Sequence, residues 1–182
     1  MKKLKARDAK NESKKLSPTE LLIIALISNG WRTLYALQKE TLLSAGALVP
    51  ALEKLRDKGL LHAEPAGPRN RRQFRVPAAI SKNIGEKWKA SADDHIVDCD
   101  AVLKLCKAAE IFDIQAAVKY ADEALELRAE KLRKYRNKAG DIVAPEPDYR
   151  SYLSYREVAK FYRLQAEEQT LRAIVAALKT DA

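Results

Sequence analysis

The sequence predicts a mainly α-helical protein, in which three helices and a two-stranded hairpin precede a helical C-terminal half. Three observations lead to this prediction. Apolar residues recur at helical spacing in three segments between residues 17 and 58. Two short apolar runs follow at residues 60–64 and 73–76, on either side of a loop rich in proline and arginine. Beyond residue 100, apolar residues again recur at steps of three and four.

The first helix has clear signals at both ends. Ser17 is a suitable N-cap, Pro18 suits the first helical position, and Glu20 completes a capping box. Residues 21–27 are all apolar, so we expect this helix to be buried on every side. The Asn-Gly pair that follows Ser28 should end it.

The second and third helices are amphipathic. Thr33 should cap a helix over residues 33–41, and Ser44 should cap the next one. The inward stripe of the third helix consists of Leu48, Leu52 and Leu55.

Pro50 lies inside the third helix, where a proline strains or bends the backbone. Gly59 should end the helix in a left-handed conformation. The two apolar runs then form short strands, joined by a turn that includes residues 65–68 and the basic residues after them. Three helices followed by a basic hairpin form the layout of a winged helix-turn-helix, a module that reads DNA.

These elements divide the chain into three parts. Residues 1–16 should form a basic N-terminal arm, because residues 1–15 hold seven basic and two acidic residues. Residues 17–90 should form the winged helix-turn-helix, and residues 91–182 a helical dimerisation domain.

The positive charge is concentrated in the N-terminal part. The net charge is +9; residues 1–80 carry 16 Lys and Arg against 7 Asp and Glu, and the remainder carries 18 of each kind. Such a surface attracts a polyanion. Charge alone leaves RNA or an acidic protein open as partners, but together with the layout it favours double-stranded DNA.

The last helix is expected over about residues 151–179, with an apolar seam interrupted only by Glu168. The seam consists of Phe161, Leu164, Leu171, Val175 and Leu178. A heptad-like seam of this kind requires a partner helix, so these five residues predict dimerisation and a homodimer.

The sequence resembles the PadR-like transcriptional regulators. Residues 44–52, S-A-G-A-L-V-P-A-L, resemble the family's S-x-G-T-L-Y-P-A-L, and residues 55–60 continue as its L-x-x-x-G-L. Tyr35 and Leu37 match the family's G-Y-x-L, and residues 72–74 resemble its basic-aromatic run into the second wing strand. Residues 102–105 resemble a segment that opens its C-terminal domain, and residues 163–178 resemble its closing dimerisation helix. The resemblance implies a DNA-binding regulator over residues 17–178.

The sequence also departs from the family pattern. Ala47 and Val49 replace its Thr and Tyr, Leu34 replaces a Gly, and Pro77 replaces a Thr. Two hydroxyl groups of the reading helix are thereby absent, so the set of DNA contacts must differ.

The candidate DNA contacts fall on the second helix, the third helix and the hairpin. They are Thr33, Tyr35, Ser44, Ala45, Ala47, Lys54, Arg69, Asn70, Arg71 and Arg72. The hairpin arginines are suited to phosphates or a narrow minor groove. Simpler interpretations of these residues stay open. Thr33 and Ser44 can act only as helix caps, and Tyr35 can pack on the edge of the core. Lys54 and the hairpin arginines can simply be solvated.

Trp88 is a candidate for lining a pocket between two protomers that takes a small aromatic effector, although a tryptophan in an interface core is the simpler interpretation. His62 and His95 lack partners at metal-ligand spacing, so no metal or cofactor is expected. Cys99 and Cys106 favour a buried apolar role over a redox one across a dimer. Enzyme motifs such as a Gly-rich phosphate loop, H-E-x-x-H or G-x-S-x-G do not occur, which argues against catalysis.

No apolar run approaches the length of about 18 residues that a membrane span needs. The charged N-terminus is no signal peptide, and two cysteines make no disulfide framework, so a cytoplasmic protein is expected. The sequence therefore predicts a homodimeric, sequence-specific DNA-binding transcriptional regulator that acts as a repressor. The alternatives are a winged-helix adaptor for protein contacts, a ligand-binding helical protein whose basic head is incidental, and a MarR-like regulator.

Overall fold

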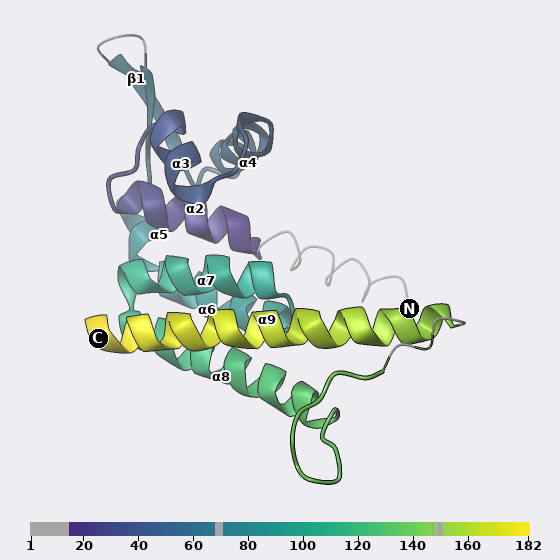
Figure 1. The fold of residues 1–182 in the computed structure, drawn as a ribbon. Helices are drawn as coiled ribbons and strands as arrows, with labels where there is room; N and C mark the ends of the chain where they lie inside the picture. Colours follow the sequence, from purple (N-terminus) through teal and green to yellow (C-terminus); the bar gives the residue numbers. More distant parts are fainter. Residues whose placement is uncertain (1–14, 68–70, 147, 149–150) are drawn as a thin grey trace, which may run out of the picture. The chain divides into compact units, whose positions relative to one another are not determined.

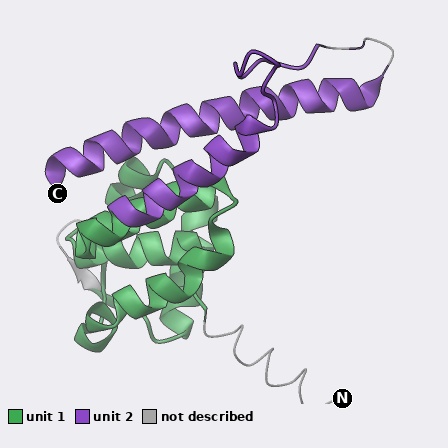
Figure 2. Cartoon of the chain, turned by 90° about the horizontal axis from the view of Figure 1, so that it is seen from below, with its two compact units in different colours: residues 1–117 green, residues 118–182 purple. Residues whose placement is uncertain are grey.

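The computed structural model describes residues 15–67, 71–146, 148 and 151–182. These residues are mainly helical, with eight helices and one two-stranded antiparallel sheet, which confirms the predicted mainly α class (Figure 1). The chain divides into two compact units, residues 1–117 and 118–182 (Figure 2). The predicted boundary, between residues 90 and 91, lies earlier in the chain.

Helix α2 (Pro18–Ser28) is the centre of the first unit. Its N-terminus has the predicted capping box, and Asn29 follows as its C-cap. All of residues 20–27 are buried, as the continuous apolar run predicted.

Helices α3 (Leu34–Thr41) and α4 (Ala45–Asp57) and strands β1 (His62–Gly67) and β2 (Arg71–Arg75) lie on one side of α2 (Figure 1). Thr33 forms an isolated antiparallel bridge with Gln73, and the N–H of Phe74 donates to the carbonyl of Arg32 at 2.8 Å. Strand β2 therefore pairs with β1 on one edge and with the segment before α3 on the other. The base of the hairpin is thereby anchored beside α3.

Both strands are shifted toward the turn relative to the predicted runs at residues 60–64 and 73–76. Pro65 was assigned to the turn but lies inside β1. The register of the β1–β2 pairing shifts between Glu64 and Gly67, and such an irregularity accommodates a proline, which has no N–H to donate.

Helices α5 (Ala78–Lys82), α6 (Ile84–His95) and α7 (Cys99–Phe112) complete the first unit. The recurrence of apolar residues beyond residue 100 predicted helical structure over α7, but no helix was predicted between the hairpin and residue 90. Helices α6 and α7 both pack against α2, on the side opposite α3 and α4 (Figure 1). This packing places the unit boundary beyond α7.

Helix α8 (Ile114–Arg133) begins at the end of the first unit and continues into the second, which also holds α9 (Tyr152–Asp181). Leu132, Phe161 and Leu164 form a buried apolar cluster there. The guanidinium of Arg128, whose side chain is 1% exposed, pairs with Glu167 on α9 at 3.3 Å. In the part of the chain that the structure describes, no helix combines the length and the hydrophobicity needed to cross a bilayer.

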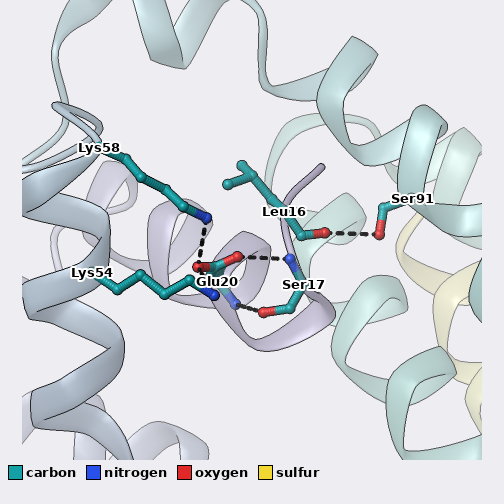
Figure 3. A network of polar contacts seen from close by, with 6 residues as sticks. All are labelled: Leu16, Ser17, Glu20, Lys54, Lys58 and Ser91. Carbon is teal, nitrogen blue, oxygen red and sulfur yellow. Dashed lines mark hydrogen bonds and ion pairs between the residues drawn. The ribbon is translucent and has the colours of Figure 1, made fainter. Parts of the chain in front are cut away.

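A buried carboxylate joins α2 to α4 (Figure 3). Glu20, 2% exposed, accepts a hydrogen bond from the backbone N–H of Ser17 at 2.8 Å. Its other carboxylate oxygen receives the ammonium groups of Lys58 at 3.0 Å and Lys54 at 3.1 Å. One side chain thus completes the cap of α2 and holds the C-terminal end of α4 against it.

Burial by itself raises the pKa of the Glu20 carboxyl. The Ser17 N–H and the ammonium groups of Lys58 and Lys54 outweigh burial and hold this pKa below its ordinary value of 4.5. A carboxyl with a lowered pKa in the folded state stabilises the protein above its unfolded pKa. That contribution is lost as the pH falls through the folded-state pKa.

We therefore expect Glu20→Gln to lower the free energy of unfolding at pH 7 by about 1–3 kcal/mol, because two ammonium groups lose their carboxylate. The difference from the wild type should begin to shrink as the pH falls below 4.5, where the unfolded chain takes up a proton, and should disappear once the pH has fallen through the lowered folded-state pKa. Urea unfolding at pH 7 and pH 3 measures both effects. Glu53→Gln, on the exposed face of α4, is the matched control. Equal effects of the two variants at pH 7 would contradict this role of Glu20.

Candidate nucleic-acid interface

The first turn of α4 presents small side chains to solvent. Ser44, Ala45, Gly46 and Ala47 are all exposed, whereas Leu48 is completely buried. The hydroxyl of Ser44 accepts the N–H of Ala47 at 3.3 Å, which confirms Ser44 as the N-cap. With only small side chains on this turn, another surface can approach the helix backbone closely.

Helix α3 packs against α4. Thr33 caps α3, because its hydroxyl accepts the N–H of Ala36 at 3.2 Å. The side chain of Tyr35 is 72% exposed, so it is not packed on the core edge. Among the described residues, no hydrogen bond to the Tyr35 hydroxyl is found. This hydroxyl is therefore available to a phosphate or another polar partner.

The hairpin contributes Arg72, whose side chain is exposed and has no carboxylate within ion-pair distance in the described part of the chain. Arg69 and Asn70, which were predicted as DNA contacts, lie outside the described residues. Arg71 begins strand β2, and its side chain is likewise outside the described part.

Lys54 has a different environment from the one predicted. Its ammonium group pairs with the buried Glu20, although the side chain is 61% exposed. Because Lys54 shares the Glu20 carboxylate with Lys58, its charge is partly neutralised, and Lys54 contributes less to the attraction of an anion than does Arg72, which has no ion-pair partner among the described residues.

A cavity of about 500 Å³ lies between α3, α4 and the hairpin, within the first unit. We call it the reading-head cavity. Helix α4 lines it with Val49, Leu52, Glu53 and Arg56, which recur at helical spacing, and β2 lines it with Arg72 and Phe74, which alternate onto one face of the strand. This cavity was not predicted from the sequence, although both spacings are visible there.

The five residues predicted for dimerisation have a different setting from the one expected. Phe161, Leu164, Leu171, Val175 and Leu178 are 2%, 5%, 0%, 7% and 5% exposed in the single chain. In the single chain the apolar stripe is therefore already covered, so its burial does not require a second copy. Phe161 and Leu164 pack on Leu132 of α8, which supplies part of that cover.

Trp88 packs inside the first unit. It is 7% exposed, its indole N–H donates to the carbonyl of Leu105 at 2.8 Å, and its ring meets Phe112 edge-on at a centroid distance of 6.1 Å. Trp88 does not line the reading-head cavity. The environment of the indole in the single chain is therefore that of a core residue.

Neither cysteine is in a disulfide. Burial, together with Cys99 and Glu110, raises the pKa of the Cys106 thiol to about 12, so Cys106 is an unreactive thiol at neutral pH. Within the described residues, no three His, Cys, Asp or Glu side chains gather closely enough to hold a metal ion.

The sequence matches no protein-family model and no curated protein. A proposal on function therefore depends on the geometry of α3, α4 and the hairpin and on the residues themselves.

The cap on α4 leads to a stability prediction. Ser44→Ala should lower the free energy of unfolding by about 1 kcal/mol, because the N–H of Ala47 loses its acceptor. Ser44→Asn keeps a capping oxygen and should remain close to the wild type. Thermal unfolding of the three proteins in the absence of DNA measures the effect. Equal stability of Ser44→Ala and the wild type would mean that the hydroxyl does not stabilise the helix.

Proposed function

We propose that this protein is a sequence-specific DNA-binding transcriptional regulator that works as a homodimer and acts as a repressor. One observation carries the proposal: the start of α4 exposes only small side chains, and the exposed Tyr35 and Arg72 lie on the neighbouring elements. This arrangement suits a helix that enters a groove while side chains beside it hold the phosphate backbone.

The order of the elements supports a winged helix-turn-helix. Helix α2, the bridging residue Thr33, helices α3 and α4, and the hairpin follow one another in the order typical of that module. The bridge of Thr33 to Gln73 acts as a one-residue third strand that fixes the hairpin beside α3. In this reading α4 is the recognition helix and β1–β2 is the wing.

The composition of α4 determines what kind of readout we propose. Ala45 and Ala47 offer apolar contact to a thymine methyl group, and they cannot hydrogen-bond to a base edge. Base-specific hydrogen bonds are therefore few. We infer that shape and deformability of the DNA supply much of the specificity, with Arg72 reaching a phosphate or a narrow minor groove.

A homodimer would present two recognition helices to successive major grooves, about 34 Å apart. The five-residue stripe of α9 is buried in one chain, so the dimer contact we propose involves other surface. The resemblance to PadR-like regulators agrees with this function but adds no independent geometry.

Selection from random duplex DNA with the purified full chain tests the proposal. A two-fold symmetric consensus with half-sites one helical turn apart would support both DNA recognition and the homodimer. An asymmetric consensus would contradict the homodimer. A lack of affinity for any duplex at low salt would overturn the proposal and favour a winged-helix adaptor that contacts proteins.

Arg72→Gln should weaken binding to all duplex sequences severalfold and should reduce the slope of log affinity against log salt by about 0.9, the value for one phosphate contact. The change removes one exposed cation and leaves the strand pairing intact, because only the backbone of Arg72 belongs to the sheet. Titration of labelled duplex at four salt concentrations gives the slope.

The matched control is Arg133→Gln, which removes an exposed arginine from the end of α8. Its salt slope should equal that of the wild type. If the two variants changed the slope by the same amount, only the net charge would matter, and the contact assigned to Arg72 would be wrong.

A further inference from the structure

The reading-head cavity has the composition of a small-molecule site. Its volume of about 500 Å³ lies within the range of ligand pockets, and its walls include the apolar side chains of Leu34, Val49, Leu52 and Phe74. Leu52 is 3% exposed and Val49 is 39% exposed, so the cavity has a buried floor and an open mouth. An apolar ring system could therefore lie on this floor with one side toward the mouth.

Several polar groups in the lining lack a partner. Among the described residues, the side chains of Gln38, Glu53 and Arg72 make no hydrogen bond or ion pair. Arg56 also reaches the lining, but its guanidinium is shared with Asp57 at 3.3 Å. A few unpartnered polar groups beside apolar walls are what orient a ligand in such a pocket.

One cation of the lining is available to an anionic ligand. The lining holds two guanidinium groups, Arg56 and Arg72, and one carboxylate, Glu53. Arg56 is already paired, which leaves Arg72 as the group best placed to receive an acidic group. A sulfonate or carboxylate can take two parallel hydrogen bonds from a guanidinium.

We propose that the reading-head cavity binds a compact, ring-containing apolar molecule with one negative charge, and that such a ligand lowers the affinity for DNA. The ring lies on Val49, Leu52 and Phe74, and the anionic group lies on Arg72. This site is distinct from the surroundings of Trp88, which is a core residue.

The ligand lowers the affinity for DNA because both partners would bind the same side chain, Arg72. Arg72 is the cation that we assign to a DNA phosphate, and it cannot hold a phosphate and the ligand's anion at once. The ligand also occupies the space beside α4 and Tyr35. The competition rests on the proposed function, whereas binding of the ligand to the cavity does not.

Strand β2 offers an internal control for the charge. Arg72 and Phe74 share the face that lines the cavity, and Arg75 lies on the alternate face of the same strand, exposed and absent from the lining. Arg72→Gln and Arg75→Gln therefore remove the same charge from the same strand, but only one of them removes it from the cavity.

The probe for the test is 8-anilinonaphthalene-1-sulfonate, an apolar ring system with one sulfonate, and its neutral counterpart is N-phenyl-1-naphthylamine. Fluorescence titration of the folded full chain should show saturable binding of the sulfonate at one site, with a dissociation constant on the order of tens of micromolar. The neutral probe should bind about tenfold more weakly. Arg72→Gln should weaken binding of the sulfonate about tenfold, the loss expected for one charge-assisted contact, and Arg75→Gln should have no such effect.

A second variant tests the apolar lining of the reading-head cavity. Val49→Phe places a larger side chain in the cavity and should weaken binding of both probes by about tenfold or more, because the space for the ring is filled. Its control is Val97→Phe, which adds the same ring at a site that is 60% exposed and outside the cavity. The circular dichroism spectrum and thermal unfolding of each variant establish that it is folded before titration. If Val49→Phe does not fold, the pair Arg72→Gln and Arg75→Gln decides alone.

The outcomes separate this inference from the proposed function. Equal binding of the sulfonate by all folded variants, or no saturable binding by the wild type, would overturn the cavity as a ligand site, even if the protein binds DNA. Binding that depends on Arg72 and Val49 in a protein without affinity for DNA would support the site and overturn the proposed function. When both hold, saturating sulfonate should weaken binding of the wild type to duplex DNA severalfold; unchanged DNA affinity would overturn the competition.

Discussion

The first unit depends on one constraint: helix α2 is apolar around its whole circumference and must be covered on every side. Residues 20–27 are all buried, and each fully buried Leu or Ile stabilises the fold by about 1.5–3 kcal/mol relative to an exposed one. Helices α3 and α4 and strand β2 cover only one side of α2, so α6 and α7 must cover the other. A fragment that ended at residue 90 would uncover α2, which explains why the compact unit extends to residue 117.

Glu20 is the polar exception on this helix, and its position determines how α4 is held. The carboxylate lies in the first turn of α2, where it suits the helix dipole, and it draws in Lys54 and Lys58 from the last turn of α4 and its C-cap. The C-terminal end of α4 is thereby fixed to the core. The N-terminal end, capped by Ser44, is left exposed. A helix anchored at one end and open at the other suits the role that we propose for α4, in which its first turn contacts DNA.

Features that depend on neighbours close in the sequence could be predicted, whereas features that join distant parts of the chain could not. The capping box at Ser17, the cap at Ser44 and the left-handed Gly59 depend on neighbours within a few residues, so the sequence sufficed to predict them. The ion pairs of Glu20 join residues that are 34 and 38 positions apart, and the reading-head cavity needs three elements placed together. Helices α5 and α6 were not predicted, although Ile84, Trp88 and Ala92 of α6 recur at helical spacing and are buried where α6 packs on α2 and α7.

The stripe on α9 shows what periodicity can and cannot establish. Apolar residues at steps of three and four indicate that one face of a helix will be buried, but they do not indicate which chain will bury it. In the second unit α8 supplies apolar cover through Leu132, and Arg128 pairs with Glu167 between the two helices. A buried arginine costs free energy unless it is paired, so this ion pair favours one alignment of α8 with α9 over others. The heptad-like spacing is therefore accounted for by burial inside one chain, and it does not by itself require a homodimer.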